Sequence, residues 1–276
     1  MLSGLDLLLL AALGLLGGAG AGFLGIGGSV VMIPGMVLLF GPDRQHLYQA
    51  AAMIVNFFTI APAVVRHYQA GATLRSVVRW TIPSAVVGAV AGVFISDLPV
   101  FRGSGQGYLQ IGFATFLLYV VVHNLWTLWS GLRMPALDRH RPRRSSRLLT
   151  VLLVGLPAGL LAGILGIGGG LVAVPMQQVA LRIRLPNAIA NSATTILYSS
   201  IVGAMVKNYT LTQHGFHVGD SLLLAACLTP SAMIGSWFAA AKVHQWPVFV
   251  IRIVFAVMLT YAAAKLLLTG WGQVQL

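Results

Sequence analysis

Acidic residues are nearly missing from this chain of 276 residues, which has five Asp residues and no Glu. Charged residues of both signs make up 8% of the chain, whereas soluble domains carry roughly 25%. Because so little charge cannot cover a water-facing surface, a soluble globular domain is excluded. The single cysteine, Cys227, excludes an internal disulfide and a cysteine metal cluster.

Apolar residues replace the missing charge. They make up 58% of the chain, and the mean hydropathy is +0.87. Long apolar stretches separated by short polar loops recur from end to end, and a helix needs about 20 such residues to cross hydrocarbon about 30 Å thick. The sequence therefore predicts an all-α polytopic membrane protein, with the lipid bilayer as its main partner.

The few carboxylates lie away from the centres of these stretches. All five are in loops or at segment ends: Asp6, Asp43, Asp97, Asp138 and Asp220. Proton relays and cation sites in membranes usually depend on a carboxylate buried at mid-depth. The sequence thus favours an anion over a cation as a bound solute, and it makes proton coupling through a carboxylate less expected.

One loop holds much of the net charge of +12. Six of the seventeen basic residues lie in it: Arg133, Arg139, Arg141, Arg143, Arg144 and Arg147. No aromatic residues or RNA-binding signature accompany them, so nucleic acid is not expected as a partner. A positive loop is typical of the cytoplasmic side of a membrane protein, where lipid headgroups contact it.

The chain also repeats itself. The segment Gly22–Pro34, GFLGIGGSVVMIP, falls on Gly163–Pro175, GILGIGGGLVAVP, at a shift of 141 residues. We therefore predict a first transmembrane repeat over residues 1–132, a basic cytoplasmic linker over 133–147 and a second transmembrane repeat over 148–276.

Each half contains a long apolar segment broken by glycines and then three ordinary spans. The broken segments cover residues 5–40 and 148–181, and the ordinary spans cover 48–65, 77–96, 106–128, 189–206, 219–241 and 247–268. A continuous helix over 5–40 would extend about 54 Å, so a glycine-broken helical hairpin is the simpler structure. Each half then crosses the membrane an odd number of times. The second repeat is therefore expected to be inverted, with both termini on the periplasmic face.

Two kinds of glycine pattern occur in the broken segments. Glycines four residues apart are typical of close helix packing: Gly14, Gly18, Gly22, Gly155, Gly159 and Gly163. The runs over residues 25–28 and 166–170 place too many helix-disfavouring residues in one turn, at about 1 kcal/mol each relative to alanine. We expect each run to interrupt its helix, and such interruptions survive in a bilayer only where protein or a water-filled cavity satisfies the backbone.

A short helix is expected after each interruption, near Ser29 and near Leu171. Its first amides have no acceptor within the helix, and they lie at the positive end of the helix dipole. Glycine lets a ligand approach the backbone closely. The predicted anion site therefore comprises the glycine runs and the residue after the first: Gly25, Gly27, Gly28, Ser29, Gly166, Gly168, Gly169 and Gly170.

Polar side chains nearby are further candidates. They are Asn56 in the first half and Asn191, Ser192, Thr194 and Thr195 in the second. They could donate to an oxyanion, but hydrogen bonding between helices explains them equally well. Pro34 and Pro175 are expected to end or kink the short helices. His123 is the intramembrane group best placed to titrate, although a structural role is the better explanation. No metal or cofactor is expected.

At the repeated motif the chain resembles the sulfite exporter TauE/SafE family of bacterial membrane transporters, also grouped as toluene-sulfonate uptake permeases. The residues that carry the resemblance are Gly22–Ser29 with Pro34 and Gly163–Gly170 with Pro175. The resemblance implies a multi-pass inner-membrane protein that exports or takes up sulfite, organosulfonates or related small anions. This chain departs from the pattern at Ser29, opposite Gly170, and at Gln49-Ala-Ala-Ala, opposite a hydroxyl-rich stretch. We therefore expect the first repeat to contribute backbone contacts and the second most side-chain contacts.

Three functions remain open. An alternating-access carrier is the principal expectation, with a passive anion channel as the alternative. A membrane-embedded enzyme is less expected, because the sequence shows no acidic pair, no HExxH motif and no histidines predicted to converge.

Overall fold

The computed structural model describes residues 3–24, 27–131, 147–242 and 248–275, so Gly25 and nearly all of the predicted linker lie outside the described residues. The described part is helical throughout, and seven of its helices are long and apolar enough to cross a membrane. The α-helices are α1 Gly4–Leu24, α2 Ser29–Phe40, α3 Gln45–Gln69, α4 Arg75–Ser96, α5 Gln106–Gly131, α6 Arg147–Leu149, α7 Leu156–Leu165, α8 Gly170–Ala180, α9 Leu185–Thr210, α10 Val218–Lys242 and α11 Val248–Val274. Short 3₁₀ turns are η1 Pro42–Arg44, η2 Pro99–Phe101, η3 Gly103–Gly105 and η5 Leu211–His214, and η4 Thr150–Gly155 is a π-helical stretch joining α6 to α7.

Both predicted helix breaks are present. The first long segment stops at Leu24 and resumes at Ser29, and the second stops at Leu165 and resumes at Gly170. The six ordinary spans correspond to α3, α4, α5, α9, α10 and α11, with ends within a few residues of those predicted. The prediction of a helical membrane protein with two broken segments is therefore confirmed.

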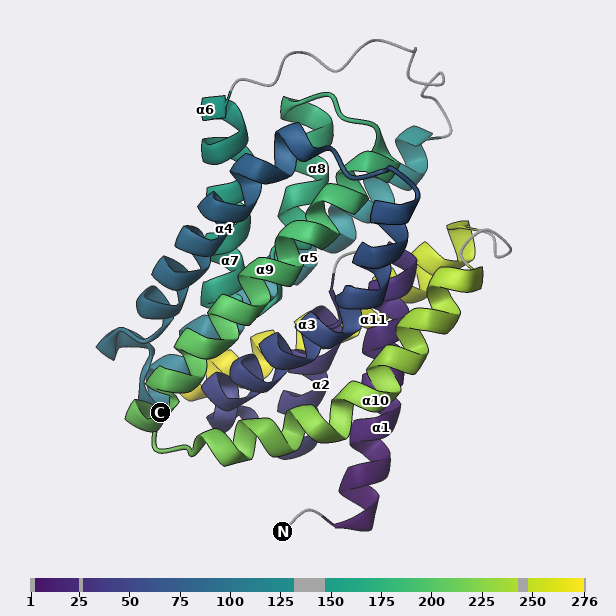
Figure 1. Cartoon of the computed structure of the whole chain (residues 1–276). Helices are drawn as coiled ribbons and strands as arrows, with labels where there is room; N and C mark the ends of the chain where they lie inside the picture. The colour runs from purple at the N-terminus through teal and green to yellow at the C-terminus, as the bar shows by residue number, and fades with distance from the viewer. Residues whose placement is uncertain (1–2, 25–26, 132–146, 243–247, 276) are drawn as a thin grey trace.

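The two long segments pack against helices of the opposite half. α1 lies along α10 and α7 lies along α4 (Figure 1). A Cβ atom added to Gly14 would collide with Ser231, and one added to Gly155 would collide with Ser84. These glycines therefore permit close helix contact, as the spacing of four residues indicates.

Many large apolar side chains are exposed on the outside of the bundle, while several polar side chains are buried inside it together with the hydrophobic core. Leu5, Leu8 and Leu268 are among the most exposed large side chains. On α3, by contrast, Gln45, His46, Gln49 and Asn56 are almost completely buried. Spacings of three, four and seven residues place such side chains on one face of a helix. We call this buried polar face of α3, made of Gln45, His46, Gln49 and Asn56, the α3 stripe.

Candidate functional site

The two helix breaks lie next to each other. A Cβ atom on Gly27 would be 3.3 Å from Asn56 Oδ1 and 3.5 Å from the carbonyl oxygen of Ile167. A Cβ atom on Gly168 would be 3.2 Å from Asn56 Nδ2. The side chain of Asn56 therefore lies between a glycine of the first break and a glycine of the second.

Asn56 also fixes the start of α2. Its Oδ1 accepts a hydrogen bond from the Ser29 amide at 3.2 Å, and its Nδ2 donates to Ser29 Oγ at 2.8 Å. One of the amides that the sequence predicts to be free is thus bonded to a side chain in this structure. An anion at the first break would have to bind other amides or displace this contact.

The second break depends on left-handed backbone. Gly166, Gly168 and Gly169 have φ angles of +77°, +71° and +74°, a region that residues with a Cβ rarely adopt. At the end of α7, Gln49 Nε2 donates to the carbonyl oxygen of Ile164 at 3.0 Å. At the start of α8, the amides of Gly170 and Leu171 belong to the first turn and have no acceptor within the helix.

The matched prolines lie inside the short helices rather than at their ends. Pro34 is in α2 and Pro175 is in α8. The expectation that they end these helices is therefore wrong, and only the alternative of a bend remains. Each proline lacks an N–H, so the carbonyl groups of Val30 and Leu171, four residues earlier, lose a helical hydrogen bond.

Most of the predicted polar residues of the second half are bonded to other helices or to their own. Asn191 Nδ2 donates to Gln177 Oε1 at 2.9 Å, and Asn191 Oδ1 accepts from the Leu74 amide at 2.7 Å. Thr195 lies 2.9 Å from Thr81, and Thr194 donates to the carbonyl of Ala190. Ser192 is different: its Oγ is buried without a hydrogen-bond partner among the described residues.

The side chains that bond the breaks come from the α3 stripe in the first half: Asn56 at the start of α2 and Gln49 at the end of α7. The expected division of anion contacts between the two repeats stays a prediction. Sequence analysis identified Asn56 but missed Gln49. Polar residues repeating at helical spacing along an otherwise apolar span would have revealed the stripe.

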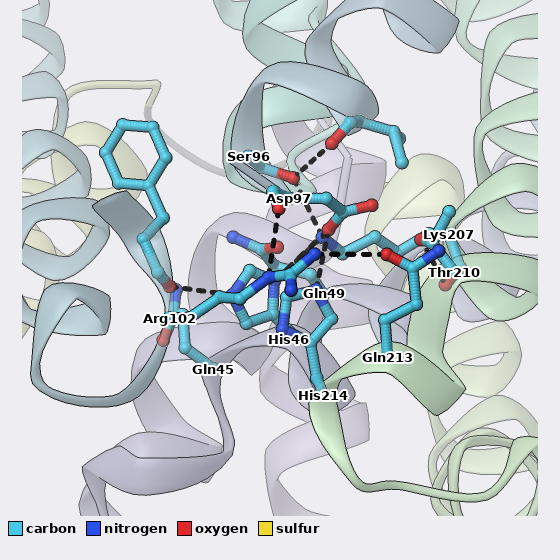
Figure 2. A network of polar contacts seen from close by, with 12 residues as sticks. Gln45, His46, Gln49, Ser96, Asp97, Arg102, Lys207, Thr210, Gln213 and His214 are labelled. Carbon is cyan, nitrogen blue, oxygen red and sulfur yellow. Dashed lines mark hydrogen bonds and ion pairs between the residues drawn. The ribbon is translucent and has the colours of Figure 1, made fainter. Parts of the chain in front are cut away.

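A second buried polar group lies where α4 and α9 end (Figure 2). We call Asp97, Lys207, His46 and His214 the outer cluster. Lys207 Nζ donates to Asp97 Oδ1 at 2.6 Å and to Ser96 Oγ at 2.8 Å, and it lies 2.8 Å from His46 Nδ1. His214 Nε2 lies 3.0 Å from Asp97 Oδ1, and the two imidazole rings stack at 3.7 Å.

The outer cluster corrects two sequence-based expectations. His46 and His214 do converge, from α3 and η5. Asp97 follows the end of α4 as expected, but it is 7% exposed and paired with a Lys207 that is fully buried. Burial by itself raises the pKa of the Asp97 carboxyl, yet the hydrogen bond from His214 and the positive charge of Lys207 outweigh burial and lower that pKa below its usual value.

The two histidines and Asp97 have donor atoms close enough to suggest a metal site. The ammonium group of Lys207, however, already lies within hydrogen-bond distance of His46 and Asp97. Because the ammonium group of Lys207 already lies between these side chains, we infer that they bind Lys207 rather than a metal ion.

Two other features lie away from both groups. The ring of His123 contacts Tyr119 and Trp126, which are on the same helix. An open groove of about 410 Å³ lies between α5 and α11 and is lined mainly by apolar side chains, including Leu125, Ile253 and Val257. Such a lining does not suit an anion.

Comparison with known proteins identifies a family of membrane transporters. The model of the family described as sulfite exporter TauE/SafE matches residues 10–266. The chain is 29% identical to the probable membrane transporter protein MamO of Magnetospirillum gryphiswaldense, over 96% of this chain and 45% of that protein. It is 28% identical to MamO of Paramagnetospirillum magneticum, over 95% of this chain and 44% of that protein.

A third relative is similar in length. The chain is 24% identical to the probable membrane transporter protein MJ0441 of Methanocaldococcus jannaschii, over 86% of each chain. By contrast, this chain spans less than half the length of the two MamO proteins that it matches. No solved structure matches it.

Proposed function

Because this chain belongs to the sulfite exporter TauE/SafE family of membrane transporters, we propose that it carries a small oxyanion, sulfite or an organosulfonate, across the bacterial inner membrane by alternating access. The observation that supports this proposal best is the meeting of the two helix breaks at Asn56. Backbone that leaves helical geometry within a bilayer requires polar partners, and a bound oxyanion supplies them.

The substrate site is formed by the glycines and first amides at the two breaks. Helix amides and the positive ends of α2 and α8 attract negative charge, and the glycines leave room for the anion to approach the backbone. The described residues of both breaks are buried away from bulk water, so each of these interactions is stronger than it would be in water.

The two halves act as inverted repeats, with residues 1–132 and 148–276 in opposite orientations. Reciprocal packing of α1 on α10 and of α7 on α4 supports this arrangement, because each broken segment contacts the matching helix of the other half. Both termini then lie on the periplasmic face. Rocking of one half against the other exposes the central site to each side in turn.

A flux experiment on the purified protein in liposomes tests the proposal. Sulfite, methanesulfonate, sulfate and small carboxylates are offered one at a time, and uptake and counter-exchange are measured. We expect saturable flux of sulfite or methanesulfonate with counter-exchange. Conductance far above carrier turnover would indicate a passive anion channel instead.

Glycine variants connect the flux to the breaks. Gly27→Leu and Gly168→Leu are each expected to lower flux at least about 100-fold while the protein still inserts, because a side chain enters the anion position and strains positive-φ backbone. Gly71→Leu is the matched control, since Gly71 has a φ of +64° but open space around it. Unchanged flux in both break variants would falsify the proposed site.

A further inference from the structure

Lys207 in the outer cluster has all three of its ammonium protons assigned. Its acceptors are Asp97 Oδ1, Ser96 Oγ and His46 Nδ1, at 2.6, 2.8 and 2.8 Å. Ser96 Oγ donates its own proton to the carbonyl of Val93, and His46 Nε2 donates to the carbonyl of Phe101. His46 is therefore neutral, with its proton on Nε2. Among the residues that the structure describes, the carboxylate of Asp97 is the only negative charge bonded to the fully buried Lys207.

Several polar atoms beside this cluster are buried without a partner in the described part of the chain. They are both side-chain amide atoms of Gln45, Oε1 of Gln49 and Oδ2 of Asp97. All three side chains lie together in Figure 2. Buried polar atoms of this kind usually bind water or a ligand.

Gln49 connects this region to the central site. Its Nε2 donates to the carbonyl oxygen of Ile164, at the end of α7, and its Cβ and Cγ lie 3.0 Å from a Cβ placed on Gly166. Gln49 lies on the same α3 stripe as His46, and His46 contacts Lys207. Polar side chains on one face of α3 therefore contact both the second helix break and the buried ammonium group.

We propose that Lys207 is a second binding residue for the transported oxyanion, and that Asp97 occupies it as an internal anion in this structure. The oxyanion enters together with a proton, which neutralises Asp97 as it leaves Lys207. The inference rests on the proposed function and adds to it a coupling ion and an outer subsite.

The charges of the cluster explain why a proton must accompany the anion. If the oxyanion bound to Lys207 while Asp97 stayed ionised, two negative groups would face one buried cation. In the proposed step the contact between Lys207 Nζ and Asp97 Oδ1 breaks, a contact between Nζ and the oxyanion forms, and a solvent proton binds the carboxyl group of Asp97. Lys207 then has one ionised partner both before and after the step: first the carboxylate of Asp97, and afterwards the oxyanion.

The other charged and titratable groups around Asp97 are less suitable for this proton. His46 can accept it at Nδ1 only by losing its hydrogen bond from Lys207. His214 binds Asp97 through Nε2, and its proton would place a second cation beside Lys207. Arg102 donates to the backbone carbonyl of Asp97 and to the side chain of Gln213.

Infrared difference spectroscopy tests the proton directly, because the chain has five Asp residues and no Glu to contribute carboxyl bands. We expect sulfite added to the wild-type protein to produce a band of a protonated carboxyl group. The band should be missing in Asp97→Asn. It should persist in Asp220→Asn, the matched control, because Asp220 is exposed and its carboxylate accepts a hydrogen bond from the His217 amide, away from the outer cluster.

Binding measurements test the lysine. Lys207→Met alone leaves Asp97 buried without its cation, so the double variant Lys207→Met/Asp97→Asn is used to keep the cluster neutral. We expect Asp97→Asn to bind sulfite at least as tightly as the wild-type protein, because the carboxylate that competes for Lys207 is removed. The double variant should bind sulfite about tenfold or more weakly than Asp97→Asn, because a charged hydrogen bond is lost.

The outcomes separate this inference from the proposed function. If the wild-type protein binds neither sulfite nor methanesulfonate, the proposed function fails, and the inference fails with it. If sulfite binds but produces no carboxyl band, if the band survives in Asp97→Asn, or if the double variant binds as tightly as Asp97→Asn, the inference is overturned while the central site stands.

Discussion

The two helix breaks have nearly the same sequence but are stabilised in different ways. At the first, the described backbone has one glycine with positive φ, Gly27, and Asn56 bonds the start of α2. At the second, three glycines have positive φ. The residue that matches Asn56 in the second half is Leu197, which has no side-chain acceptor for the start of α8.

This difference shows that both copies of a repeat can keep a helix break while different groups form the hydrogen bonds to its backbone. A side chain already bonds the start of α2 at the first break, whereas the start of α8 at the second has no side-chain partner among the described residues. If both breaks contact the anion, the second should supply more of the free amides. The following predictions test that asymmetry, starting with the largest expected effect.

Stability should depend more on glycine at the second break than at the first. Gly169→Ala places a Cβ atom against the backbone carbonyl of Ala158 at a φ of +74°, so we expect a loss of about 3 kcal/mol in unfolding free energy. Gly28 has a φ of −76°, and its added Cβ would lie 2.8 Å from the end of the movable Met32 side chain and 3.0 Å from the carbonyl oxygen of Gly17. Gly28→Ala should therefore cost only about 1 kcal/mol.

Thermal unfolding in detergent, with refolding checked, compares these two glycine variants. Equal losses would mean that the two breaks depend on glycine to the same degree, which would remove the proposed asymmetry.

Asn56→Asp changes the charge at the meeting point with little change in shape. The carboxylate can still accept from the Ser29 amide and can accept from Ser29 Oγ, so folding should be retained. A negative charge between Gly27 and Gly168 should nevertheless weaken sulfite binding by about tenfold or more. Titration calorimetry on the folded variant measures this effect, and unchanged affinity would place the anion away from Asn56. Asp220→Asn, an exposed change of charge, is the control.

Much of the fold could be predicted because membrane constraints leave strong signals in sequence. Spans follow from the length of apolar runs, and the breaks follow from the glycine runs over residues 25–28 and 166–170, because each glycine in a helix costs about 1 kcal/mol relative to alanine. The ends of α3 and α9 differ from prediction because Gln45, His46, Lys207 and Asn208 extend these helices with polar residues. Hydropathy counts such residues as loop, although they are buried by neighbouring helices.

The site was only partly predictable. The glycine breaks are local features, so their positions follow from the sequence. The outer cluster is not local, because it joins His46 to Asp97 and Lys207 across long stretches of chain. The sequence places Asp97 at the end of a span. Its burial depends on packing against α9, and no pattern in a single sequence shows that contact. Asn191 was a candidate by residue type, and its bonds to Leu74 and Gln177 depend equally on tertiary contacts.

The smallest expected effect on stability is that of Ser192→Ala in the second half, and comparison with Asn191→Ala separates a binding role from a structural one. Its neighbour Asn191 joins two helices, so Asn191→Ala should lower the unfolding free energy by about 2 kcal/mol and leave sulfite affinity unchanged. Ser192 Oγ is buried without a partner among the described residues, so Ser192→Ala should change stability by no more than about 0.5 kcal/mol.

The same two variants decide whether the hydroxyl of Ser192 contacts the anion. If it does, Ser192→Ala should weaken sulfite binding about threefold to tenfold while stability stays constant, because a neutral hydrogen bond contributes about 1 kcal/mol. Affinity that stays constant in Ser192→Ala but falls in Asn191→Ala would reverse the assignment. The second break would then use the amide side chain that this structure shows bonded to other helices.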